Sequence, residues 1–432
     1  MYYAIIDCDN CYVSCERVFH PELNGKAVVV LSNNDGCVVA RSAEAKQLGI
    51  RAGQPYYQVR QQFTEQQVVA LSSNYELYGE LTARVMSIIR QQTPSFFRYS
   101  IDEAFARFDD SFLPMLKQWG EDLHHTIQQQ VGIPISTGIA ATKTLAKIAS
   151  RFAKRYPGYH HACFIESDSQ REKALRLTDI DDVWGIGRRY AARLKNLGVR
   201  TAADFVSKGE GWMRMRFNNK GILRTWKELC GEDCIPNEQP APKQSICTSR
   251  TFSTLLTDAD AIRTHVANYA AWCAEKLRKQ HSVAAIVSVF VDTNPFREDL
   301  PQHHEFKEYT FSSPTSTTVD IVKAAEHVLM KLLRPGYHYK RAGVIVMGIT
   351  ADSAVQTDMF DFNFGQYQKK RRLDRAIDTI NKQYGANTLT LATQQYSGKA
   401  KDGKATTFAD NICRDMKTKN PTTRWNDIIT LK

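Results

Sequence analysis

Two adjacent acids interrupt an otherwise apolar stretch, "FFRYSIDEAFARF" at residues 96–108, whose composition predicts a β-strand. Asp102 and Glu103 repel each other, and a carboxylate buried without a partner is costly. Side chains alternate between the two faces of a regular strand, so both acids can serve one site only where the backbone bends, for instance at a hairpin end. A solvent-facing hairpin tip is the alternative interpretation.

A third acid, Asp7, follows a short apolar strand at residues 3–6 and precedes a helix with apolar residues at helical spacing. A carboxylate at the carboxyl end of a strand is well placed for a functional site. Asp7 could equally be the N-cap of the helix, where aspartate is a preferred residue.

If Asp7 meets Asp102 and Glu103 on adjacent strands, the three carboxylates need cations between them. Oxygen ligands with room for water and phosphate suit Mg²⁺, and two such ions serve phosphoryl transfer in polymerases and nucleases. A thiolate metal site is not expected from the nearby cysteines, because no fourth soft ligand is close, and small buried side chains explain them better: these are Cys8, Cys11 and Cys15.

Basic residues that such a site needs lie in two places. Arg41 precedes a short helix that stops near Gly49, and Lys46 lies on that helix. Both could face an anion. A strand at 133–140 is followed by a helix whose basic residues suit a triphosphate or a DNA backbone, although a plain solvated surface is the alternative. These residues are Lys143, Lys147, Arg151, Lys154 and Arg155.

Residues 179–198, "DIDDVWGIGRRYAARLKNLG", predict a helix, a Gly-Ile-Gly hairpin and a basic helix. Gly185 and Gly187 allow the backbone to approach a phosphate closely. The following helix presents its N-terminus, which binds anions, and begins with Arg188 and Arg189. The pattern is typical of a helix-hairpin-helix that grips DNA backbones without reading their sequence.

Length and charge set the frame for these motifs. The chain has 432 residues, enough for three or more domains, and a formal net charge of +11, of which residues 366–432 carry +8. A basic chain suggests nucleic acid as a partner. No apolar run reaches the length of a membrane span, the start lacks a signal peptide, and the ten cysteines fit a reducing cytoplasm, so we expect a cytoplasmic location.

The second half of the chain predicts a smaller sheet domain. The segment 231–244 contains three prolines and marks a boundary. Beyond it, two helices alternate with two strands, "VAAIVSVFVDT" and "RAGVIVMGITA", which indicates a small sheet backed by helices. The basic region after residue 366 is expected to be a binding appendage, partly flexible when alone.

Taken together, the motifs resemble those of the Y-family of translesion DNA polymerases, and within it the UmuC-like branch. The matching stretches run in order over nearly the whole chain: "DCDNCYVSCE", "VVLSNNDGCVVARSAEAKQLG", "SSNYELYG", "YSIDEAF", "TKTLAKIAS" and "DDVWGIGRR". The resemblance implies an α+β multidomain, right-hand polymerase. Its expected domains are a palm (1–24 and 75–165), fingers (25–74), a thumb (166–233), a linker (234–242), a little finger (243–350), a second linker (351–365) and a basic C-terminal region (366–432).

The resemblance also implies roles for single residues. Asp7, Asp102 and Glu103 would hold two Mg²⁺ ions, assisted by the Cys8 carbonyl. Tyr12 falls at the steric gate, an aromatic residue that crowds a ribose 2′-hydroxyl. Lys154 falls at a triphosphate-binding lysine. Many family members carry Tyr and Arg three residues apart in the fingers, whereas this chain has Ala43 and Lys46 there, a departure that UmuC-like chains share and that puts a phosphate role for Lys46 in doubt.

The implied function is error-prone synthesis on damaged template, with primer-template DNA and dNTP as substrates, in the SOS response to DNA damage. The implied partners are a cleaved UmuD-type dimer, which the basic 366–432 region is a candidate to contact, and RecA. Residues 356–360, "QTDMF", resemble a sliding-clamp-binding peptide through Gln356, Met359 and Phe360. A two-metal nuclease and a non-catalytic DNA-binding subunit are the alternatives, and the order of the motifs over the whole chain argues against both.

Overall fold

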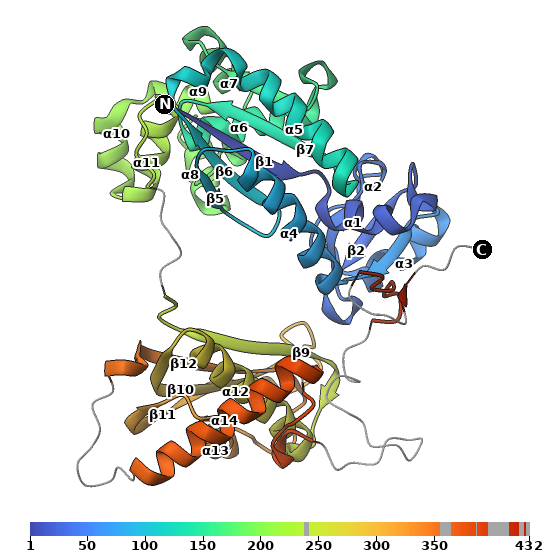
Figure 1. Ribbon diagram of the computed structural model, residues 1–432, viewed down its shortest axis with the longest axis vertical. Helices are drawn as coiled ribbons and strands as arrows, with labels where there is room; N and C mark the ends of the chain where they lie inside the picture. The colour runs from blue at the N-terminus through green and yellow to red at the C-terminus, as the bar shows by residue number, and fades with distance from the viewer. Residues whose placement is uncertain (237–241, 355–363, 386, 396–413, 423–426, 429–432) are drawn as a thin grey trace. The chain divides into compact units, whose positions relative to one another are not determined.

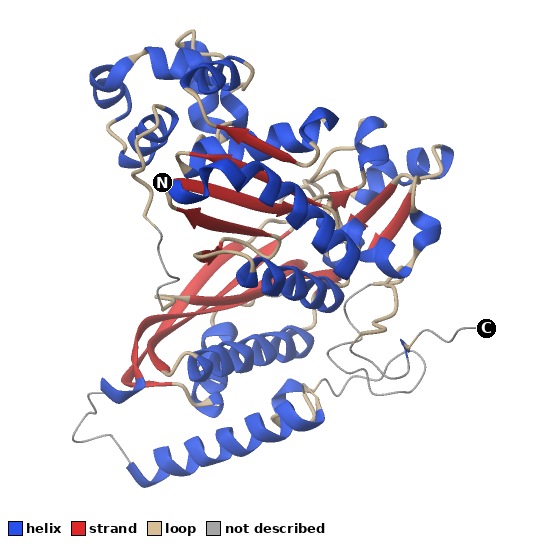
Figure 2. Ribbon diagram, turned by 45° about the horizontal axis from the view of Figure 1, so that its top comes forward, coloured by secondary structure: helices blue, strands red, loops and turns tan. Residues whose placement is uncertain are grey.

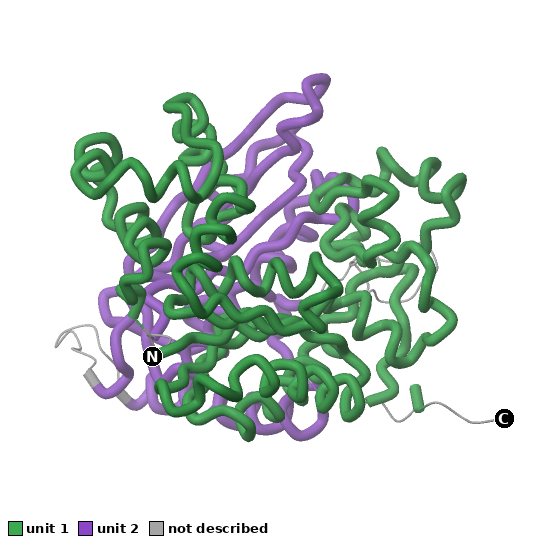
Figure 3. Tube along the Cα trace, turned by 90° about the horizontal axis from the view of Figure 1, so that it is seen from above, with its two compact units in different colours: residues 1–239, 414–432 green, residues 240–413 purple. Residues whose placement is uncertain are grey.

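The computed structural model describes residues 1–236, 242–354, 364–385, 387–395, 414–422 and 427–428. The chain forms two compact units, shown in different colours in Figure 3: Met1–Gln239 with Arg414–Lys432, and Pro240–Cys413. The C-terminal region that begins at residue 366 is therefore divided between the two units. Within the described residues, no helix has both the length and the apolar character that a membrane span needs.

The first unit is built on a five-stranded sheet (Figure 1). Its strands, in spatial order, are β5 (Phe96–Arg98), β6 (Glu103–Phe108), β1 (Tyr2–Cys8), β7 (Ile135–Ala140) and β8 (Ala162–Ile165). The helices that pack on it are α1 (Cys11–Phe19), α4 (Tyr75–Gln91), α5 (Leu116–Val131) and α6 (Lys143–Arg155).

Strand β1 lies in the middle of this sheet, antiparallel to both β6 and β7. Because side chains alternate along a strand, Tyr3 and Ile5 pack with α6 on one face, while Ala4 and Ile6 pack with α4 and α5 on the other. The sheet is thus buried on both sides, and the end of β1 at Cys8 is held rigidly where chemistry is expected.

A second, three-stranded sheet lies within residues 25–74 and has its own small apolar core. Its strands run in the order β3 (Val38–Arg41), β2 (Val28–Leu31) and β4 (Val69–Ser72), so β4 is an edge strand. The helical segments around it are η1 (Pro21–Leu23), η2 (Asn33–Asp35), α2 (Ala43–Gln47) and α3 (Tyr56–Glu65).

Helices dominate residues 166–233. They are α7 (Asp168–Arg176), η5 (Ile180–Asp182), α8 (Arg188–Asn196), α9 (Ala202–Ser207), α10 (Gly209–Phe217) and α11 (Lys220–Leu229). Two short 3₁₀ helices lie earlier in the chain, η3 (Asp110–Met115) and η4 (Pro157–Tyr159). One buried carboxylate connects this helical region to the sheet. Glu228 of α11 is fully buried and accepts hydrogen bonds from the backbone N–H of Thr144 at the start of α6 (3.0 Å), Cys234 (3.0 Å) and Ile235 (3.1 Å). A carboxylate at a helix N-terminus is favoured by the helix dipole, so the start of α6 is fixed by a residue of α11.

The second unit is a four-stranded antiparallel sheet with helices packed on it (Figure 2). Its elements are β9 (Ile246–Leu256), α12 (Ala259–Lys279), β10 (Ser282–Thr293), β11 (His304–Thr315), α13 (Thr318–Met330), β12 (Tyr339–Ala351), η6 (Asp352–Ala354), α14 (Phe364–Tyr384) and η7 (Ala392–Gln394). The sequence identified two of the four strands, β10 and β12. It missed β9 and β11, which carry mostly exposed and half-exposed side chains.

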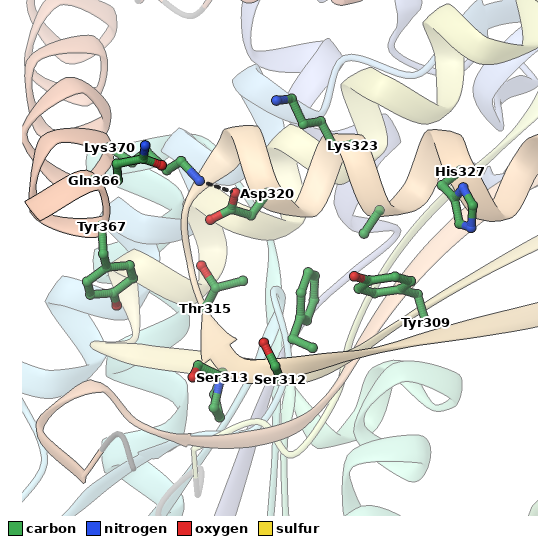
Figure 4. A pocket seen from close by; sticks show the side chains of 13 residues that line it. Tyr309, Ser312, Ser313, Thr315, Asp320, Lys323, His327, Gln366, Tyr367 and Lys370 are labelled. Atoms are coloured by element: carbon green, nitrogen blue, oxygen red, sulfur yellow. Dashed lines mark hydrogen bonds and ion pairs between the residues drawn. The ribbon is translucent and has the colours of Figure 1, made fainter. Parts of the chain in front are cut away.

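Ion pairs attach α14 to the rest of the second unit. Lys370 pairs with Asp320 of α13 at 2.5 Å, beside a pocket of about 530 Å³ that β11, α13 and α14 line (Figure 4). Arg278 of α12 donates two hydrogen bonds, each 2.7 Å, to Asp378. The first part of the basic C-terminal region is therefore bound to this unit through α14.

Candidate active site

Asp102 and Glu103 lie at the end of a hairpin, where the backbone bends and both side chains can serve one site. The hairpin joins β5 to β6, and the Ser100 hydroxyl organises its turn. This hydroxyl accepts the N–H groups of Asp102 (3.2 Å) and Glu103 (3.0 Å) and donates to Asp102 Oδ1 at 2.6 Å. The Cys8 N–H donates to the Asp102 carbonyl at 3.1 Å, so the turn is also tied to the end of β1.

Strand register brings Asp7 to this pair. Asp7 of β1 lies directly opposite Glu103 of β6. Burial raises the pKa of Asp7 to about 7, a rise that Lys154 opposes and that the charges of Glu103 and Asp102 increase. The three carboxylates therefore interact electrostatically at one edge of the sheet.

Two lysines of α6 neutralise these acids. Lys154 Nζ lies 2.6 Å from Asp7 Oδ1, and Lys147 Nζ lies 2.6 Å from Glu103 Oε1. The lysines are seven residues apart, which is two helical turns, so both project from the same side of α6. The N-terminal cap of α6 is Thr142, whose hydroxyl accepts the N–H of Leu145. The long, well-capped helix thus places one cation on each of two acids.

The donor set suits a hard divalent cation, but the side chains are not arranged around one. Among the described residues, no three His, Cys, Asp or Glu side chains converge closely enough to hold a metal ion. Asp7 and Glu103 are turned to the two lysines instead. The Cys8 thiol is buried, and hydrogen bonding with Cys11 raises its pKa, so it stays protonated and only the Cys8 carbonyl is suited to an ion. Carboxylate and carbonyl oxygens are the ligands that Mg²⁺ prefers.

Tyr12 belongs to a stack of aromatic rings beside the acids. Its ring stacks on Tyr78 of α4, with centroids 4.5 Å apart and planes at 14°, and meets the edge of Tyr75 at 5.8 Å. The Tyr78 hydroxyl donates to Glu16 of α1 at 2.6 Å. Burial raises the pKa of Tyr12 to about 12, so the phenol is neutral at ordinary pH. The ring of Tyr12 is held in one place by α4.

The two basic residues of the three-stranded sheet lie differently. Lys46 Nζ donates to Asn10 Oδ1 at 2.6 Å, in the left-handed turn that joins β1 to α1. Burial lowers the pKa of Lys46, and the nearby charges of Arg41 and Lys154 lower it further. Arg41 donates to the Ile50 carbonyl at 2.8 Å, which fixes its side chain within its own sheet domain. Lys46 is therefore near the acids, while Arg41 has a structural partner.

The Gly-Ile-Gly hairpin joins a 3₁₀ turn to α8. The expected first helix is only the three-residue η5, which differs from the α-helix that the sequence suggested. Gly185 has φ +92°, and a Cβ there would lie 2.3 Å from Thr225 Oγ1, so glycine is required. Gly187 precedes α8, at whose start Arg188 and Arg189 are exposed. The hairpin also approaches the acids, because Trp184 Nε1 donates to the Tyr99 hydroxyl at 3.1 Å.

Sequence reasoning missed a set of residues around Asp9. Asp9 Oδ1 lies 3.4 Å from Lys154 Nζ, and Asp9 Oδ2 accepts a hydrogen bond of 2.7 Å from Ser136 of β7. His161 Nδ1 lies 3.8 Å from the same carboxylate. The Asp-Cys-Asp spacing in "DCDN" was the available signal, because residues two apart at a strand end emerge on one face. Asp9 is a second anchor for Lys154.

The clamp-binding residues Gln356, Met359 and Phe360 lie outside the described residues.

Comparisons with known proteins cover the whole chain. Family models for the impB/mucB/samB family match residues 6–151, those for its C-terminal domain match 243–359, and a domain of unknown function matches 371–431. Protein UmuC of Salmonella typhimurium is 37% identical over 100% of both chains. Protein ImpB of the same species is 35% identical, over 99% of this chain and 98% of that one.

More distant similarities extend to DNA polymerases. DNA polymerase IV of Desulfatibacillum aliphaticivorans is 28% identical over 90% of this chain and 95% of its own. A solved Y-family DNA polymerase chimera has a TM-score of 0.65 at 23% identity and covers 81% of this chain and 100% of its own. An insertion ternary complex of the Dbh DNA polymerase has a TM-score of 0.54 at 22% identity over the same shares. These structures share the fold.

Proposed function

The chain belongs to the impB/mucB/samB family and is a UmuC-like, Y-family translesion DNA polymerase, and we propose that Asp7, Asp102 and Glu103 are its catalytic carboxylates. The observation that carries the proposal is the pairing of Asp7 with Glu103 across β1 and β6, with Asp102 in the adjoining turn. Neither the nuclease nor the non-catalytic alternative agrees with the family, whose relatives include DNA polymerase IV over 95% of its length.

In this proposal the three carboxylates and the Cys8 carbonyl would hold two Mg²⁺ ions, which would supply Lewis-acid activation of the primer 3′-hydroxyl and charge neutralisation of the triphosphate. Lys154 would then turn from Asp7 to the incoming triphosphate and stay within reach of Asp9. Lys147 would leave Glu103. Tyr12 excludes a ribose 2′-hydroxyl, Lys46 and Arg41 add positive charge toward the triphosphate, and Gly185, Gly187, Arg188 and Arg189 grip the primer-template backbone.

Replacement of the acids tests this assignment. Asp7→Asn, and Asp102→Ala combined with Glu103→Ala, are expected to lower nucleotide addition by at least about a thousandfold, by analogy with the loss of other electrostatic catalytic groups. DNA affinity should remain close to that of the wild-type chain, because Arg188 and Arg189 still contact phosphates. Primer extension and a DNA-binding assay measure the two effects. Normal extension by either variant would refute the assignment.

The remaining partners follow from the UmuC-like family. We propose that the chain acts in the SOS response with a UmuD-type cleaved dimer and RecA, and that Gln356, Met359 and Phe360 form a peptide that binds the sliding clamp. The support for the peptide is its spacing: a long amide precedes two adjacent apolar residues, a pattern that suits docking into a pocket of a partner.

A further inference from the structure

A short segment near the C-terminus, residues 414–422, belongs to the first unit and packs there against residues 72–76, more than 340 residues earlier in the sequence. In Figure 1 it is the red segment beside β2 and α3. Its Met416 pairs with the edge strand β4: the Ser72 N–H donates to the Met416 carbonyl at 3.1 Å, and the Met416 N–H donates to Ser72 Oγ at 3.1 Å. The Met416 side chain packs against the apolar core of the three-stranded sheet. We call this segment the C-terminal strap.

The strap then continues from the three-stranded sheet to the start of α4, a helix that packs on the five-stranded sheet. Strand β4 ends at Ser72 and α4 begins at Tyr75. Between them lies Asn74, fully buried, whose Nδ2 donates to Thr418 Oγ1 at 3.1 Å. Two residues further along the strap, Asn420, only 1% exposed, donates to Glu76 at 2.5 Å. A buried amide nitrogen without a partner costs free energy, so the bonds made by these two Nδ2 groups make the contact specific rather than incidental, while neither Oδ1 has a partner among the described residues.

The strap also touches the support of the proposed steric gate. Asn74, whose amide donates to Thr418, also accepts a hydrogen bond of 3.1 Å on its carbonyl from the Tyr78 N–H in the first turn of α4. Tyr78 is the ring on which Tyr12 stacks. A continuous series of contacts therefore runs from Thr418 through Asn74 and Tyr78 to Tyr12.

We propose that the C-terminal strap positions Tyr12 and the junction between the two sheets, and thereby sets sugar selectivity and nucleotide affinity from within the same chain. This assigns a role to part of the region matched only by a domain of unknown function. The effect on sugar selectivity rests on the proposed gate function of Tyr12, whereas the bracing of residues 72–78 does not. Thr418, Asn420 and Asn74 act as positioning residues and touch no reacting atom.

The test uses full-length variants with single changes in the strap. Thr418→Val keeps the shape of the side chain and removes its hydroxyl, and Asn420→Ala removes the amide that reaches Glu76. Lys419→Ala is the matched control, because its side chain is exposed and only its backbone carbonyl accepts from Asn74. Both test variants should raise the ratio of ribonucleotide to deoxyribonucleotide insertion and the KM for dNTP several-fold, with unchanged DNA affinity. The control should match the wild-type chain.

A second measurement separates the strap from the gate. Hydrogen exchange of the amides at residues 72–78 should become faster in Thr418→Val and Asn420→Ala and stay unchanged in Lys419→Ala. Exchange that does not change in either test variant would overturn the proposal. If exchange and KM change but neither Thr418→Val nor Tyr12→Ala alters sugar choice, the gate assignment fails and the strap remains. If Tyr12→Ala alters sugar choice and the strap variants do not, the positioning of Tyr12 by the strap is wrong.

Discussion

At the scale of single residues, two acids of the candidate site form ion pairs with lysines of α6. Lys154 and Lys147 each neutralise one of the carboxylates that we propose as metal ligands. In that proposal each carboxylate would exchange an ammonium group for a divalent cation, and Asp9 would offer Lys154 a second acid during the exchange. The charge of Lys154 also offsets the burial that disfavours ionisation of Asp7.

Removal of the Tyr12 ring tests the gate directly. Tyr12→Ala should raise ribonucleotide insertion relative to deoxyribonucleotide insertion by roughly tenfold or more, which corresponds to about 1.4 kcal/mol of lost steric discrimination. Tyr12→Phe is the control, since it keeps the ring that stacks on Tyr78. Single-nucleotide insertion kinetics with matched dNTP and NTP measure the ratio. An unchanged ratio in Tyr12→Ala would make Tyr12 a packing residue only.

At the scale of elements, the hairpin before α8 depends on one of its two glycines for its conformation. Gly185→Ala would place a methyl group against Thr225 at a positive φ, so we expect a loss of stability of about 1–3 kcal/mol and weaker DNA binding. Gly187→Ala is the matched control for stability, because its Cβ would meet no atom within 4 Å. Thermal unfolding of both variants checks the difference in stability, and equal unfolding temperatures would contradict it. DNA titration compares Gly185→Ala with the wild-type chain.

A buried histidine gives the second unit a dependence on pH. His265 of α12 packs against the Phe252 ring at 4.8 Å, and burial lowers its pKa to about 4. In the unfolded chain His265 is protonated near pH 6.5, whereas in the folded chain it stays neutral down to about pH 4. The free energy of unfolding is therefore highest above pH 6.5 and decreases as the pH falls from 6.5 toward 4. At pH 5 the loss should be about 2 kcal/mol.

Denaturant unfolding of the full chain at pH 7 and pH 5 measures this loss. His265→Phe should unfold with a smaller difference between the two pH values than the wild-type chain. An equal difference in both proteins would assign the acid sensitivity to other groups.

The sequence predicted the acids better than their partners. Asp102 and Glu103 stood out because two adjacent carboxylates conflict with strand alternation, and the conflict itself predicted the hairpin end. The pairing of Lys147 with Glu103 was not predictable, because every basic residue on the outer turns of α6 looks alike until the tertiary fold brings one against an acid. The role of Asp9 was missed although its spacing of two residues from Asp7 was an available signal.

The missed elements share a physical cause. Strand β11, "HEFKEYTFSSPT", has few buried side chains and no clear alternation of apolar and polar residues, so its main stabilisation is pairing with β10. The C-terminal strap consists mostly of polar residues, and its partners lie in β4 and α4. Local patterns cannot show elements that depend on distant segments, even where the family and its order of motifs are evident.

At the scale of the whole molecule, the basic C-terminal region serves two units. Its first part, α14, pairs with α12 and α13, and its last part is the strap on the first unit. The net positive charge of residues 366–432 therefore does not belong to one independent appendage. The C-terminal region therefore contributes α14 to the second unit and the strap to the first.

The clamp-binding peptide is tested in the whole protein. Gln356→Ala combined with Met359→Ala and Phe360→Ala should leave single-nucleotide insertion unchanged, because the acids remain, and should abolish stimulation by the sliding clamp. Thr357→Ala combined with Asp358→Ala is the control within the same segment. Extension of long templates with and without clamp measures the stimulation. Stimulation that survives in the triple variant, or unfolding of that variant, would contradict the peptide assignment.

The buried Glu228 couples the position of α6 to that of α11. The N-terminal end of α6 is bound to α11 through the Thr144 N–H. Further along the same helix, Lys147 pairs with Glu103 and Lys154 pairs with Asp7. The proposed DNA-binding hairpin adjoins α11, because Gly185 lies against Thr225. If the hairpin grips a duplex as we propose, a shift of α11 would be passed to α6 and would move both ammonium groups relative to the carboxylates. DNA binding and release of the proposed metal ligands would then be coupled.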